Sequence, residues 1–153
     1  MPRAERLVRD FNAIFKENDK IYRDAARRLG LSDTVFWILY MIREAEGPVF
    51  QRDIIGLSFL PPQTVNSALK KLQSDGFAEL RGNTSDRRCK QIALTEKGES
   101  LAQRTVDRAI AAEGRAMAEF EDADIFLRLF ERYNGLLKDA FAKMEGGSGS
   151  EQL

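Results

Sequence analysis

Four basic side chains lie close together in the sequence and form its strongest chemical signal. Arg81, Arg87, Arg88 and Lys90 fall within ten residues, and Asp86 is the one acid among them. Guanidinium groups bind phosphate oxygens and are attracted to the negative potential of a narrow minor groove. The cluster therefore predicts contact with nucleic acid. The alternative is that these charges only keep an exposed loop soluble.

The residues around this cluster have the pattern of a β-hairpin. Ala78 and Leu80 alternate with polar neighbours before the cluster, and Ile92 and Leu94 do so after it. Such alternation is typical of half-buried strands. The loop that starts at Gly82 is rich in small polar residues, which favour turns. We therefore expect the basic residues at the tip of a hairpin.

A helix with one polar face is expected directly before the hairpin. The proline pair at 61–62 suits a first helical turn, and Gly76 suits the carboxyl-terminal stop. Val65, Leu69 and Leu72 are four and three residues apart, which predicts one buried stripe. The opposite side is polar, so this helix is a candidate for reading DNA rather than only a solvated surface helix.

The polar side of this helix offers two kinds of DNA contact. Amides and hydroxyls can reach base edges, whereas lysines bind phosphates. The candidate residues are Gln63, Thr64, Asn66, Ser67, Lys70 and Lys71. With the basic hairpin beside it, such a helix can enter one groove while the hairpin enters the next.

Apolar spacing predicts the other elements. Steps of three and four indicate a long amphipathic helix over 4–29, and a broadly apolar helix follows from Ser32 or Asp33 to about residue 46. A short helix fits 51–58. After the hairpin, one long helix is expected over 95–120 and a final one over 122–144. Together with the first helix, the last two helices carry more apolar surface than one small core needs, which predicts a partner chain.

Composition excludes several classes of protein. The chain has 153 residues, a formal net charge of +0, a single cysteine (Cys89) and no histidine. It therefore lacks the usual zinc ligands and a histidine-based triad, and we expect no metal, no cofactor and no enzymatic activity. No run of residues resembles a signal peptide or a membrane span, so we expect a cytoplasmic protein without a membrane partner. Residues 146–153 read as a flexible tail, either native or a cloning remnant.

Two motifs resemble the MarR-type winged-helix regulators, the multiple antibiotic resistance regulator family. One is Asp86-Arg87-Arg88 followed by a strand that ends in Leu94-Thr95-Glu96-Lys97-Gly98, and the other is LKKLQSDGF over 69–77. The resemblance implies a mainly α fold with a small β-hairpin wing, namely a winged helix-turn-helix with long N- and C-terminal dimerisation helices. It implies one domain over 1–145, with a DNA-binding lobe at about 32–98 and dimerisation helices at about 4–29 and 96–145.

The resemblance also implies a function. The protein would be a homodimeric transcriptional regulator, expected to be a repressor, that binds a palindromic operator in double-stranded DNA. Arg88 would enter the minor groove, Arg87 would lie beside it, and Asp86 would brace the arginine at the wing tip. The alternative class is a winged-helix module that uses the same helix to bind another protein.

A small aromatic effector is a further partner that the resemblance implies. In proteins of this type, aromatic ligands bind between the DNA-binding lobe and the dimerisation helices. Candidate lining residues are Phe11, Phe15, Tyr22, Phe36, Trp37 and Tyr40, with Arg43 as an anion partner. The alternatives are an ordinary core for the aromatic residues and a surface charge for Arg43. Cys89 has basic neighbours that favour its thiolate, so it is either a redox sensor or an unremarkable thiol.

Overall fold

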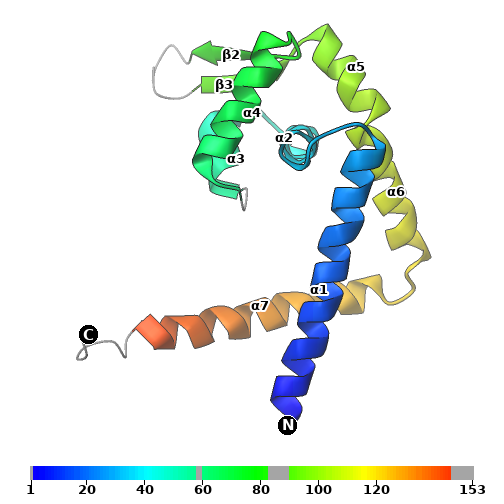
Figure 1. The fold of residues 1–153 in the computed structure, drawn as a ribbon. Helices are drawn as coiled ribbons and strands as arrows, with labels where there is room; N and C mark the ends of the chain where they lie inside the picture. Colours follow the sequence, from blue (N-terminus) through cyan, green and yellow to red (C-terminus); the bar gives the residue numbers. More distant parts are fainter. Residues whose placement is uncertain (1, 58–59, 83–89, 146–153) are drawn as a thin grey trace. The chain divides into compact units, whose positions relative to one another are not determined.

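The computed structural model describes residues 2–57, 60–82 and 90–145. The chain forms two compact units, one up to Ala111 and one from Ala112 onward. The elements are α1 (Arg3–Arg28), α2 (Asp33–Glu44), β1 (Val49–Phe50), α3 (Gln51–Leu57), α4 (Pro62–Ser74), β2 (Ala78–Gly82), β3 (Lys90–Leu94), α5 (Glu96–Arg104), α6 (Val106–Glu119) and α7 (Ala123–Glu145). The predicted fold class, a mainly helical winged helix-turn-helix, is confirmed (Figure 1).

The junction between α1 and α2 is set by local sequence. Gly30 has a φ of 73°, its N–H donates to Arg27 O at 3.0 Å, and the N–H of the next residue donates to Ala26 O at 2.9 Å. This is the paired hydrogen-bond pattern that ends many helices at glycine. Ser32, one of the two predicted caps, then accepts a hydrogen bond from Val35 N at 3.3 Å.

The structure contains a three-stranded antiparallel sheet, whereas the sequence predicted only a two-stranded hairpin. The strand order is β1-β3-β2, and β2 pairs with β3 from Ala78 opposite Leu94 to Gly82 opposite Lys90. The additional strand β1 places Val49 opposite Ile92. The hairpin prediction is confirmed but incomplete, because two residues are too few for the alternation that marks a strand in a sequence.

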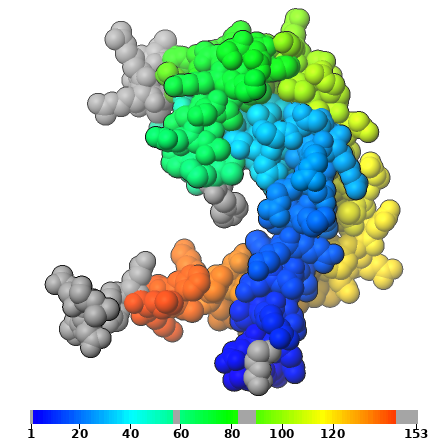
Figure 2. Space-filling model, in the orientation of Figure 1, coloured from blue at the N-terminus to red at the C-terminus, as the bar shows by residue number. Residues whose placement is uncertain are grey.

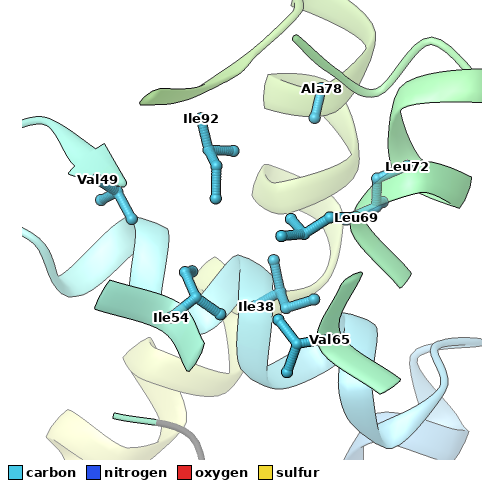
Figure 3. Packing of buried hydrophobic residues seen from close by; sticks show 8 residues of the cluster. All are labelled: Ile38, Val49, Ile54, Val65, Leu69, Leu72, Ala78 and Ile92. Carbon is cyan, nitrogen blue, oxygen red and sulfur yellow. The ribbon is translucent and has the colours of Figure 1, made fainter. Parts of the chain in front are cut away.

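The apolar side of α4 is held in a core that α2, α3 and the sheet share. Val65, Leu69 and Leu72 are buried, which confirms the predicted stripe. Figure 3 shows them pointing toward the side chains of the other elements. The cluster comprises Ile38, Val49, Ile54, Val65, Leu69, Leu72, Ala78 and Ile92. Because this face of α4 is fixed, its polar face has a defined orientation.

The expected single helix over 95–120 is wrong, because the chain breaks at Thr105 into α5 and α6. Thr105 has a φ of −122° and a ψ of −90°, and its buried hydroxyl donates to Leu101 O at 2.6 Å. Its N–H donates to Ala102 O at 3.1 Å, one residue short of the helical pattern. A threonine hydroxyl that bonds back to the preceding turn competes with regular helix formation.

The second unit contains α7, which begins one residue after the predicted restart. The N–H of Phe126 donates to Asp122 O at 2.9 Å, which confirms the start of a helix there. The ring of Phe126 lies 5.6 Å from that of Phe120 and 5.9 Å from that of Phe130, measured between centroids. Across the described ranges, no helix is both long enough and apolar enough to span a membrane.

Candidate nucleic-acid interface

The polar face of α4 carries all six side chains that the sequence selected on this helix. Gln63, Thr64, Ser67, Lys70 and Lys71 are exposed, and Asn66 is half-buried. Opposite them lie the buried Val65, Leu69 and Leu72. The structure therefore brings the candidate base readers and phosphate binders onto one helix whose other side is fixed in the core.

The carboxyl end of α4 turns sharply into β2. Gly76 has a φ of 75°, its N–H donates to Gln73 O at 3.0 Å, and the N–H of Phe77 donates to Leu72 O at 2.8 Å. This confirms Gly76 as the predicted helix stop. In the last turn, Lys71 Nζ lies 3.1 Å from a carboxylate oxygen of Asp75. An exposed pair of this kind is weak, so Lys71 can exchange it for a phosphate.

One residue that sequence reasoning missed contacts this polar face. Gln51, the first residue of α3, donates a hydrogen bond from Nε2 to Asn66 Oδ1 at 2.6 Å. Both side chains are partly buried. The pair is fifteen residues apart in the sequence, so no local pattern could have revealed it. The amide of Asn66 is therefore held in one orientation by its neighbour.

The two wing strands contain the first and the last basic residue of the predicted cluster. Arg81 lies on β2, where its guanidinium pairs with the carboxylate of Glu79 at 3.0 Å, and Lys90 begins β3. Asp86, Arg87 and Arg88, together with Cys89, lie outside the described residues. Their roles at the wing tip therefore stay predictions.

Several hydrogen bonds connect the wing strands and the end of α4 to the start of α5. Thr95 caps α5 by accepting a hydrogen bond from Gly98 N at 3.1 Å, and its hydroxyl donates to Gly76 O at 2.6 Å. Lys97 Nζ donates to Asp75 O at 2.7 Å and lies 4.4 Å from the centre of the Phe77 ring. The Leu-Thr-x-x-Gly motif thus joins the end of α4, the start of β2 and the start of α5.

Four of the six aromatic residues considered for an effector site form one cluster where α1 meets α2. Ring centroids of Tyr22 and Trp37 are 5.0 Å apart, and those of Trp37 and Tyr40 are 5.4 Å apart. Phe36 is fully buried, with its ring 5.4 Å from that of Trp37. Burial raises the pKa of the Tyr40 hydroxyl, and the charge and hydrogen bond of Glu44 raise it further.

The remaining two aromatic residues lie elsewhere on α1. Phe11 and Phe15 stack on each other with centroids 5.8 Å apart. Phe15 precedes Tyr22 by seven residues, which corresponds to about 10 Å along a helix. One small site lined by all six residues would have to extend along α1.

Arg43 joins α2 to the helices on both sides of the Thr105 break. Its Nη1 donates to Glu99 of α5 at 2.6 Å, while Nε and Nη2 donate to the carboxylate of Asp107 in α6 at 2.9 and 3.2 Å. Burial alone would lower the pKa of Arg43, but the two carboxylates outweigh it and raise the pKa. Arg43 was predicted to bind an anion of the effector. In this structure it binds the carboxylates of Glu99 and Asp107.

Metal-binding chemistry finds no support in the described residues. No group of three or more aspartate, glutamate, cysteine or histidine side chains gathers there in a way that could hold a metal ion.

Comparison with known proteins agrees with this geometry. Residues 29–88 match the MarR family model. The uncharacterized HTH-type transcriptional regulator YwoH of Bacillus subtilis is 27% identical over 129 residues, covering 83% of this chain and 93% of that protein. The solved structure of NMB1585, a MarR family regulator from Neisseria meningitidis, is 26% identical with a TM-score of 0.74, and the match covers 97% of this chain and 100% of that one. The chain is similar to MarR family regulators in sequence and in fold.

The MarR fold is also found in a structure of lower sequence identity. A MarR family transcriptional regulator from Listeria monocytogenes, solved in complex with 26mer DNA, is 20% identical with a TM-score of 0.66. The match covers 95% of this chain and 97% of that one.

Proposed function

We propose that this chain is a MarR-type transcriptional regulator, namely a ligand-responsive homodimeric repressor that binds a palindromic operator. The observation that carries the proposal is that α4 exposes a polar face. Its apolar face is buried in the core, together with residues from the two strands of the basic hairpin. A rigid helix with exposed amides and lysines suits the major groove. The DNA complex of the Listeria relative supports the same use of this fold.

The proposal gives the exposed side chains two roles. On α4, Gln63, Asn66 and Ser67 read base edges, and Thr64 adds a hydroxyl near the start of the helix. Lys70 and Lys71 bind phosphates and set the register of the protein on DNA. At the wing tip, Arg87 and Arg88 approach the minor groove and Asp86 braces the arginine, as the family resemblance implies.

Dimer formation is supported by apolar side chains exposed on α1 and on α7. On α1 they are Leu7, Val8, Ile14, Phe15 and Ile21, which are 52–67% exposed. On α7 they are Ile125, Phe126, Leu127, Leu129, Leu136, Phe141 and Met144, which are 44–69% exposed. Apolar surface of this extent is unusual in a monomer, and a second copy of the chain would cover it.

The proposed operator can be found by selecting bound sequences from a random duplex library. We expect a palindrome, because two identical α4 helices related by a twofold axis read the same half-site twice. Selection of a single half-site would contradict the dimeric arrangement. If no sequence is enriched and random DNA does not bind at low salt, the protein-interaction alternative becomes the better function.

The wing makes a separate prediction about salt dependence. Arg88→Ala should weaken binding to all duplexes by a similar factor and reduce the salt slope by about one, because a wing arginine mainly meets phosphates and the groove potential. Affinities measured across a salt series, on the operator and on random DNA, test this. Arg104→Ala, which removes an arginine from α5, is the matched control and should leave the slope unchanged. An unchanged slope in Arg88→Ala would remove the wing from the interface.

The aromatic cluster makes a prediction about effectors. A small aromatic acid should bind near Trp37, the only tryptophan of the chain, and weaken operator binding. Binding linkage requires that the operator weaken effector binding by the same factor. Titrations of tryptophan fluorescence with a panel of aromatic acids, with and without operator, measure both affinities. Equal effector affinities in the two titrations would rule out the regulatory role.

A further inference from the structure

We propose that Gln51 is a positioning residue that turns the donor side of the Asn66 amide toward DNA. Gln51 would thereby make the protein prefer a base that presents a hydrogen-bond acceptor at the position Asn66 reads. The inference rests on the proposed function, since it concerns how α4 reads its operator. Its basis is the hydrogen bond from Gln51 Nε2 to Asn66 Oδ1, 2.6 Å long.

The backbone that carries Gln51 is well anchored. Gln51 follows directly on β1, and the N–H of Phe50 donates to a carboxylate oxygen of Asp53 at 2.9 Å. Ile54 of α3 and Val65 of α4 are both fully buried in the shared core (Figure 3). Because a buried neighbour fixes each helix, the two amides meet in a defined geometry.

The direction of the hydrogen bond decides what Asn66 can offer to a base. An asparagine with both amide atoms available reads adenine bidentately, accepting from N6 and donating to N7. In this structure Asn66 Oδ1 already accepts from Gln51. The two N–H groups on Nδ2 are then the part of the amide suited to a base. They match acceptors such as N7 and O6 of guanine or O4 of thymine.

The decisive experiment reverses the polarity of this pair. Operator selection with the unaltered protein and with Asn66→Ala first identifies the base pair that depends on Asn66. In Gln51→Glu the new carboxylate can only accept, so Asn66 must turn its NH₂ group toward it and present its oxygen to the base. Preference at that base pair should move from an acceptor base to a donor base, cytosine N4 or adenine N6. The expected change in the affinity ratio is about three- to tenfold, the size of one net hydrogen bond.

Two further variants separate this effect from charge and from misfolding. Gln73→Glu adds the same charge at an exposed position of α4 and should lower affinity on all sequences without changing base preference. Gln51→Ala releases Asn66 and should reduce discrimination at the same base pair. Combining Gln51→Ala with Asn66→Ala should then add little beyond Asn66→Ala alone. Circular dichroism confirms that each variant is folded.

The outcomes distinguish this inference from the proposed function. A selected operator whose Asn66-dependent base is unchanged in Gln51→Glu and in Gln51→Ala would overturn the role of Gln51 and leave operator binding intact. An operator at which Asn66→Ala changes no base preference would also overturn it. If the unaltered protein selects no sequence, the proposed function fails and this inference fails with it.

Discussion

Gly98→Ala should lower the free energy of unfolding by about 3 kcal/mol, which is one of the largest effects expected from a single methyl group in this chain. A Cβ atom at position 98 would lie 1.9 Å from the backbone oxygen of Phe77 and 2.9 Å from its carbonyl carbon. Real Cβ atoms essentially never come closer than 3.0 Å. The helix α5 would therefore have to move by about 1 Å, in a region packed at the density of an organic crystal.

The displaced atoms belong to the junction at the end of α4. Phe77 O also accepts a hydrogen bond from Thr95 N at 3.1 Å, and the Thr95 hydroxyl donates to Gly76 O at 2.6 Å. Moving α5 away would relieve the clash with the new methyl group, but it would strain or break these hydrogen bonds. We also expect the molecules that stay folded to bind the operator more weakly, because these hydrogen bonds hold the carboxyl-terminal end of α4 in place.

Denaturant unfolding of Gly98→Ala and Gly56→Ala tests this prediction. Gly56 lies exposed on the helix α3, and an added Cβ there meets nothing within 4 Å. Gly56→Ala should be neutral or stabilising by about 0.5–1 kcal/mol, the usual gain when alanine replaces a helical glycine. Equal unfolding midpoints for the two variants would show that the contact between α5 and Phe77 is not tight.

Charged substitutions on α7 should abolish the proposed homodimer. Leu129 and Leu136 are 59% and 61% exposed and lie seven residues apart on one face of the helix. Glutamate at both positions would place two like charges from each chain in an apolar interface, at a cost of several kcal/mol. Sedimentation at micromolar concentration should give a monomer or an unfolded chain in place of the dimer expected for the unaltered protein.

A matched control changes charge on the other side of the same helix. Arg128→Gln combined with Ala142→Glu alters the net charge by the same two units, and both exposed positions lie on the side of α7 that carries none of its exposed large apolar side chains. This variant should remain dimeric. A monomeric unaltered protein, or a dimeric Leu129→Glu/Leu136→Glu variant, would contradict the homodimer.

The elements that the sequence predicted well are those specified by local patterns. The stripe of Val65, Leu69 and Leu72 identified the buried face of α4, and Gly76 identified its end, because periodicity and a left-handed glycine act over a few residues. Features that depend on distant partners were missed. The strand β1 exists through its pairing with β3, and the break at Thr105 depends on one side-chain hydrogen bond.

In the candidate site, too, the features set by local patterns were predictable and those that depend on distant partners were not. The polar face of α4 followed from helical geometry, so its six residues were predictable as a group. The hydrogen bond between Gln51 and Asn66 and the pairing of Arg43 with Glu99 and Asp107 join residues that are far apart in the sequence. Only the packing of helices brings these partners together, and a single sequence does not encode that packing in any short pattern.

The strand order of the wing also bears on whether its sheet can pair with a strand from another molecule. A hairpin that projects toward DNA leaves unpaired N–H and C=O groups on its outer strand, which is a template for adding a strand from another molecule. Here β1 limits one edge of the sheet to two residues, and the exposed Glu79 and Arg81 place an ion pair on the strand at the other edge. Short edges and charged edges both oppose intermolecular strand addition. These two edges therefore make the sheet that carries the wing a poor template for a strand from another molecule.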